Sequence, residues 1–114
     1  RIAPFDGSRP ESLKVDQILA WLRLPPAERP RLVMSYWAGA DRAGHDNGPD
    51  SAEVRAALMG QDRQLARLLA GLDEDAAWGH TTLILVSDHG MTETGADLDL
   101  AGALRSAGIR ARVL

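Results

Sequence analysis

The chain has 114 residues, of which 45% are hydrophobic and 25% charged, and its net charge is −3. This length predicts one domain, residues 1–114, with a single hydrophobic core. The weak, interspersed charge excludes a nucleic-acid scaffold built on a basic surface. The chain has no cysteine, which excludes thiolate zinc sites. No apolar run approaches the roughly 18 residues of a membrane-spanning helix.

The first half of the chain is predicted to contain one helix and one strand. Residues 11–24 have an apolar face at helical spacing, formed by Val15, Ile18, Leu19 and Leu22. Pro25 ends this helix because proline lacks a backbone donor and clashes with the preceding turn. The short apolar run 31–37 (RLVMSYW) is typical of a buried strand. The segment 38–50 is rich in glycine and is predicted to be a loop.

A helix and the clearest strand follow. Residues 51–71 have helical periodicity, with Asp50 or Ser51 as the N-cap and Gly71 at the end. Residues 81–87 (TTLILVS) form a continuous apolar run, which indicates burial on both faces of a parallel sheet.

The last part of the chain is predicted to be a helix and the start of another strand. Residues 97–107 form the helix, with Asp97 as its cap and Gly108 as its stop, and residues 109–114 begin the strand. The order helix-β-α-β-α-β predicts an α/β fold with a mainly parallel sheet. Ligands of such sheets lie beyond the carboxyl ends of the strands.

Two pairs of acid and imidazole side chains follow the two apolar strands. Asp41 and His45 are four residues apart, a spacing that places both on one side of a helical turn or a compact loop. Asp88 and His89 are adjacent, and Gly90 is predicted to supply the turn that lets them face one site. If both pairs lie at one rim of the sheet, they predict two neighbouring metal ions, an arrangement that phosphoryl-transfer enzymes use.

Carboxylate and imidazole ligands suit Zn²⁺, and Mn²⁺ or another divalent first-row ion also fits. Each pair also has a simpler interpretation, because an aspartate after a strand is often a turn former or a helix cap. The metal hypothesis therefore depends on the two pairs occurring together.

Three segments of the chain resemble the type I phosphodiesterase/nucleotide pyrophosphatase family of the alkaline phosphatase superfamily. They are WLRLPPAERPRLVMSYW (21–37), DRAGHDNGPDS (41–51) and LILVSDHGM (83–91). The resemblance implies a three-layer α/β/α sandwich with two Zn²⁺ ions, and hydrolysis of phosphodiester or pyrophosphate bonds in small nucleotide-type substrates through a covalent phospho-Thr or phospho-Ser enzyme. It assigns Asp41 and His45 to the zinc that activates water, and Asp88 and His89 to the zinc that activates the nucleophile. It also implies a periplasmic or extracellular location.

The chain departs from the family pattern in two respects. Gly39-Ala40 stands where the family usually has Glu-Pro before the first metal-binding aspartate. An aspartate after an earlier strand, the nucleophile and a downstream histidine have no counterpart, so the chain is predicted to be the middle of a longer enzyme and inactive alone. Its sheet edges, lacking their neighbours, would favour self-association. The alternatives are another hydrolase of the superfamily (phosphomonoesterase, sulfatase or phosphomutase) and a non-catalytic metal-binding or interaction fragment.

Overall fold

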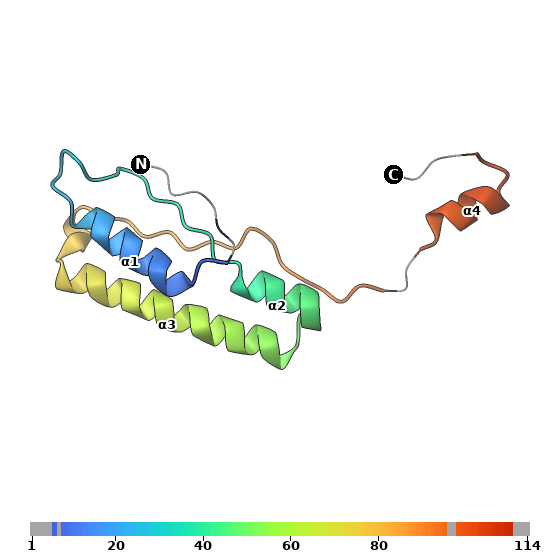
Figure 1. The fold of residues 1–114 in the computed structure, drawn as a ribbon, viewed down its shortest axis with the longest axis horizontal. Helices are drawn as coiled ribbons and strands as arrows, with labels where there is room; N and C mark the ends of the chain where they lie inside the picture. Colours follow the sequence, from blue (N-terminus) through green and yellow to red (C-terminus); the bar gives the residue numbers. More distant parts are fainter. Residues whose placement is uncertain (1–5, 7, 96–97, 111–114) are drawn as a thin grey trace.

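The described part of the chain, residues 6, 8–95 and 98–110 of a computed structural model, is helical (Figure 1). In chain order the elements are α1 (Glu11–Leu22), α2 (Gly39–Asn47), α3 (Ala52–Glu74), the 3₁₀ turn η1 (Ala77–Gly79) and α4 (Leu100–Ser106). Helices α1 and α2 both pack on α3, whereas α4 lies apart at the far end of the molecule (Figure 1). No helix among these residues is both long and apolar enough to cross a membrane.

The hydrophobic core lies between α1 and α3. Its buried residues are Val15, Leu19, Leu68, Leu72 and Ala77, and Ile18, Leu22 and Trp37 pack against them. The predicted apolar face of the first helix is therefore confirmed. Gly71 was predicted to end the helix but lies inside α3. A Cβ atom there would come within 2.7 Å of the Leu19 methyl carbons. The glycine lets the two helices approach closely.

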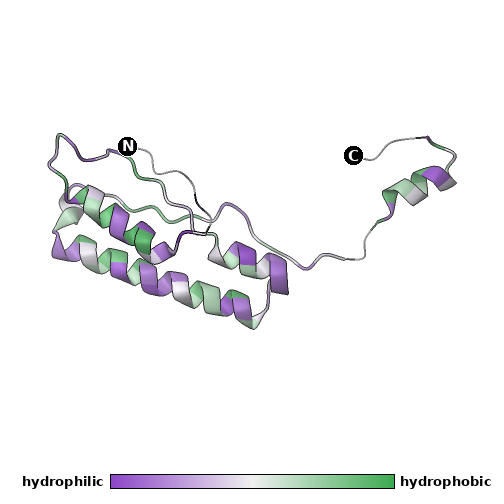
Figure 2. Ribbon diagram, viewed as in Figure 1, coloured by the Kyte–Doolittle hydropathy of each residue, from purple (hydrophilic) through white to green (hydrophobic). Residues whose placement is uncertain are grey.

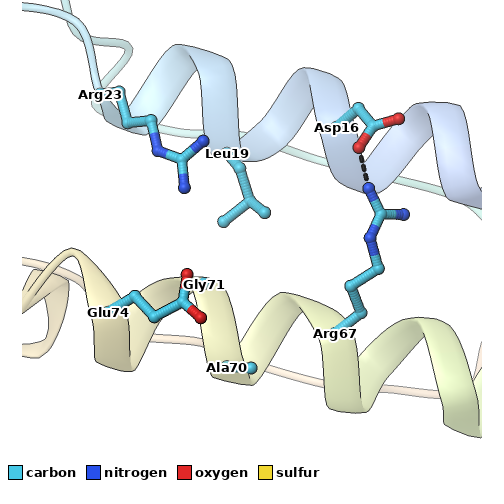
Figure 3. A pocket seen from close by; sticks show the side chains of 7 residues that line it. All are labelled: Asp16, Leu19, Arg23, Arg67, Ala70, Gly71 and Glu74. Atoms are coloured by element: carbon cyan, nitrogen blue, oxygen red, sulfur yellow. Dashed lines mark hydrogen bonds and ion pairs between the residues drawn. The ribbon is translucent and has the colours of Figure 1, made fainter.

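Polar side chains border the same contact on its outer side (Figure 3). Arg67 of α3 forms an ion pair with Asp16 of α1, and Arg23 donates to Asp75 over 2.8 Å. Figure 3 shows Leu19 reaching toward Gly71 between these two arginines. Because the pairs are largely exposed, they contribute little to stability.

The predicted parallel sheet and α/β/α sandwich are wrong for the described residues, which contain no strand. Residues 31–37 and 81–87 are extended and run in the same direction across the helices (Figure 1). Side chains of the helices bind carbonyl oxygens that a neighbouring strand would otherwise use. Lys14 donates to the Tyr36 carbonyl, and Gln61 donates to the Trp37 carbonyl. A sheet requires backbone ladder bonds between strands.

The apolar side chains of both extended segments remain largely uncovered. Leu32 is 77% exposed and Ile84 is 75% exposed, and Figure 2 shows the run 83–86 as an apolar stretch outside the core. The radius of gyration is 20.8 Å, with extents of 67 × 32 × 23 Å. A compact domain of about 100 residues has a radius of gyration of about 13 Å, so this chain is elongated.

The helix ends partly match the predictions. Ser51 caps α3 by accepting a hydrogen bond from the Val54 backbone N–H. Asp99 caps α4, and Gly108 follows that helix with a positive φ of 72°. The proposed cap Asp97 and residues 111–114 of the last predicted strand lie outside the described residues. Residues 109–110 are not part of a strand.

Candidate metal centre

Helix α2 presents the first pair of predicted ligands. The segment 38–50 was predicted to be a loop because of its glycines, but Gly39–Asn47 is helical. One helical turn separates Asp41 from His45, and their side chains meet, with Asp41 Oδ1 3.5 Å from His45 Nε2. The spacing argument for this pair is therefore confirmed in its helical form.

The extended segment that ends at Ser87 delivers the second pair to the same place. His89 Nε2 lies 3.6 Å from Asp41 Oδ1 and 3.8 Å from Asp88 Oδ2. Asp41 thus faces an imidazole of each motif, and Asp88 joins this cluster of four side chains through His89. The expected cause was the rim of a sheet, but the observed cause is the passage of residues 88–93 along helix α2 (Figure 1).

Hydrogen bonds within the second motif orient His89. Its Nδ1 donates to the Gly90 carbonyl oxygen over 2.9 Å, and its backbone N–H donates to Asp88 Oδ1 over 3.1 Å. Gly90 was predicted to supply a turn that only glycine allows, but its φ is not positive. In a neutral His89 the bond from Nδ1 leaves the Nε2 lone pair free, so that nitrogen can bind a metal ion.

The donors are arranged as pairs. Within the described residues, no group of three or more His, Cys, Asp or Glu side chains is placed to hold one ion together. Asp41 nevertheless faces an imidazole from each motif, so one carboxylate links the two pairs. Each pair supplies only part of the coordination shell of a zinc ion, which takes at least three protein ligands in catalytic sites.

The carboxylates set the electrostatics of the cluster. The pKa of His89 is raised, first by its hydrogen bond to the Gly90 carbonyl and then by the charges of Asp88 and Asp41, while desolvation opposes the shift. The pKa of Tyr36 is raised as well, first by the Asp88 charge, then by desolvation and the Asp41 charge. Tyr36, near the end of the first extended segment, is thus within reach of the charges of both carboxylates.

The shift of His89 gives a prediction for the metal-free protein. An NMR titration of labelled histidine should place the pKa of His89 above the ordinary value of about 6.5, because the surrounding groups favour the imidazolium. The contribution of the charged His89 to the free energy of unfolding is present at low pH and is lost as the pH rises through this pKa. Asp88→Asn should lower the pKa, whereas Asp62→Asn on the exposed side of α3 should leave it unchanged. A midpoint at or below the ordinary value would contradict the geometry.

Met91, the last residue of the second motif, lies against α2, and Glu93 lies against Gly48 just after that helix. Neither was predicted to be a site residue. Met91 fills the space beside Gly44, where an added Cβ atom would clash with the Met91 sulfur and lie 3.0 Å from its Cε atom. A Cβ atom on Gly48, whose φ is +89°, would lie 3.1 Å from Glu93 Oε1. The signal that could have found them is the alternation of residues 89, 91 and 93, since alternate residues of an extended segment share a face.

The family model for type I phosphodiesterase/nucleotide pyrophosphatase matches residues 2–111, almost the whole chain. The chain belongs to this family. The match includes both motifs and all four clustered side chains. The family resemblance of the three sequence segments is thereby confirmed.

Named members of the type I phosphodiesterase/nucleotide pyrophosphatase family align with most of the chain. Venom phosphodiesterase CdcPDE of Crotalus durissus collilineatus is 40% identical over 93 residues, which is 82% of this chain and 11% of that protein. An uncharacterized pyrophosphatase/phosphodiesterase of Schizosaccharomyces pombe is 40% identical over 81 residues, 71% of this chain and 17% of that protein. Ectonucleotide pyrophosphatase/phosphodiesterase family member 1 of Mus musculus is 39% identical over 89 residues, 78% of this chain and 10% of that protein.

The chain spans only about a tenth of the length of most of these relatives. No solved structure matches it. The family assignment therefore rests on the sequence match. The contacts of Asp41 with His45 and His89 show that the two motifs lie together in space.

Proposed function

We propose that the full-length protein to which this chain belongs hydrolyses phosphodiester and pyrophosphate bonds of nucleotide substrates with two bound zinc ions. The observation that carries the proposal is the position of Asp41, whose Oδ1 faces His45 of its own motif and His89 of the other. The names of the relatives support the reaction class, since they include venom phosphodiesterases and an ectonucleotide pyrophosphatase/phosphodiesterase. The words "venom" and "ecto" in these names also favour a location outside the cytoplasm.

The donor set fits zinc in its chemistry. Carboxylate oxygens and imidazole nitrogens are common zinc ligands, and His89 is held with Nδ1 on a carbonyl oxygen, as metal-bound histidines usually are. In our proposal Asp41 and His45 hold one ion and Asp88 and His89 hold the other. Further ligands, and a Thr or Ser that attacks phosphorus to form a covalent intermediate, come from other parts of the full-length protein.

The residues of this chain have two tasks in the proposed reaction. When bound, the two metal ions would place positive charge beside the phosphoryl group and activate the attacking hydroxyl groups. Asp41, lying between both imidazoles, holds the two donor pairs at a fixed separation, and Asp88 holds His89 through its backbone N–H. Tyr36 feels the negative charge of Asp88 and Asp41, which raises its pKa.

Activity measurements on the full-length protein test this function. We expect turnover of a nitrophenyl phosphodiester that is lost with a chelator and restored by Zn²⁺. Asp88→Ala should lower kcat by about 10²-fold or more, because it removes a ligand and the partner of the His89 backbone. Asp62→Ala on α3 is the matched control and should retain activity.

Parallel assays with a nitrophenyl monoester and a nitrophenyl sulfate decide between reaction classes. A strong preference for the monoester or the sulfate would contradict the proposal and indicate a phosphatase or a sulfatase of the same superfamily. Diester turnover that persists without metal, or that Asp88→Ala leaves intact, would also contradict it.

A further inference from the structure

The segment that carries the second motif lies along α2 in a regular register. His89, Met91 and Glu93 alternate along an extended chain and therefore share one side. On that side His89 meets Asp41, Met91 meets Gly44 and Glu93 meets Gly48. Asp41 and Gly44 are three residues apart in α2 and share one face, and Gly48 follows directly after the end of the helix. Three consecutive contacts thus join the two motifs.

The contact between Met91 and Gly44 leaves no room for a side chain on the helix. Gly44 is the buried residue of α2, and the Met91 sulfur occupies the volume that any larger side chain would need. Val54 in the first turn of α3 borders the same volume, since it lies 3.7 Å from an added Cβ atom at Gly44. Glycine is a weak helix former, so packing of Met91 is the physical reason for a glycine at this place in the helix.

We propose that Met91 is a positioning residue. Its side chain, packed against Gly44, sets the distance between His89 and Asp41 and so the spacing of the two donor pairs. This inference rests on the proposed function, because the spacing matters only if the donors bind ions. Met91 lies two residues beyond His89 and touches the helix turn next to Asp41, so a shift of its side chain moves the whole segment relative to α2. The flexible thioether suits such an irregular space.

A double-mutant cycle in the full-length protein tests the contact. Zinc affinity is measured by competition with a chromogenic chelator for Met91→Ala, Gly44→Ala and the double variant. Each single variant should bind zinc about 10-fold more weakly, the loss typical of residues that orient metal ligands. The double variant should bind no more weakly than the weaker single variant, because both changes disrupt the same contact. Losses that simply add would overturn the inference.

The control variants separate positioning from folding. Met91→Leu keeps the volume and should retain zinc affinity within about 3-fold, and Met59→Ala on the exposed side of α3 should have no effect. Gly44→Ala should leave the melting temperature of the metal-free protein nearly unchanged, since the higher helix propensity of alanine offsets the packing lost when Met91 is displaced. Weaker zinc binding by a chain that is no less stable is a result that a merely structural role does not produce.

The outcomes distinguish this inference from the proposed function. If the unmodified protein binds two zinc ions and hydrolyses the diester while Met91→Ala and Gly44→Ala bind zinc as tightly, only the inference about Met91 fails. If the unmodified protein binds no zinc, the proposed function fails and the positioning role fails with it. If Met91→Ala does not fold, Gly44→Ala and Met91→Leu still decide the question.

Discussion

Asp41→Asn should remove more activity from the full-length protein than any other single change in this chain. We expect kcat for a nitrophenyl phosphodiester to fall by about 10³-fold or more, because one carboxylate oxygen lies 3.5 Å from His45 and 3.6 Å from His89. Loss of its charge removes a ligand and the group that joins the two donor pairs. The zinc content, measured by mass spectrometry, should fall for both ions.

Asp46→Asn is the matched control for this change. Asp46 lies on the same helix, one residue after His45, and is exposed. It loses the same charge, so retained activity in Asp46→Asn would show that the position of Asp41 matters rather than the charge of α2. Full activity of Asp41→Asn, or loss of only one zinc ion, would contradict a carboxylate shared between both histidines.

Leu72→Ala should produce the largest loss of stability. Leu72 is 1% exposed and belongs to a core of only five buried hydrophobic residues among those described. Truncation of such a leucine costs about 2–5 kcal/mol in the free energy of unfolding, a large part of the about 5–15 kcal/mol that stabilises an ordinary domain. Urea unfolding of the 114-residue chain, followed by circular dichroism, measures the loss.

Leu58→Ala makes the same substitution on the same helix at a site that is 51% exposed. It should change the free energy of unfolding by at most about 0.5 kcal/mol, as surface substitutions usually do. Equal losses in the two variants would mean that α1 and α3 do not pack through Leu72.

The helices that form the core could be predicted because their apolar residues follow the helical period. Val15 and Leu19 are buried where the spacing placed them, and Ser51 caps α3. The glycines could not be assigned in the same way. Gly71 was predicted to stop a helix but lies inside α3, where its missing side chain makes room for Leu19. Composition does not show which neighbour occupies the space beside a glycine.

The sheet was predicted from two continuous apolar runs, and this inference omitted the partners that strands need. Residues 31–37 and 81–87 are extended, but Lys14 and Gln61 satisfy carbonyl groups at the end of the first run. The two motifs do approach each other, since Asp41 faces both His45 and His89. The prediction, however, placed the two pairs at the rim of a sheet, which the described residues do not form. Only the spacing of Asp41 and His45 on one helical turn was anticipated for the right physical reason.

The alternation of His89, Met91 and Glu93 along α2 limits how relatives of this chain can diverge. One residue inserted between His89 and Met91 would move each later side chain to the opposite face of the extended segment and turn the Met91 thioether away from Gly44. Insertions in the long stretch between the two motifs leave the alternation of residues 89–93 unchanged. Length variation among homologues should therefore occur between the motifs, and changes within 89–93 should come in steps of two residues.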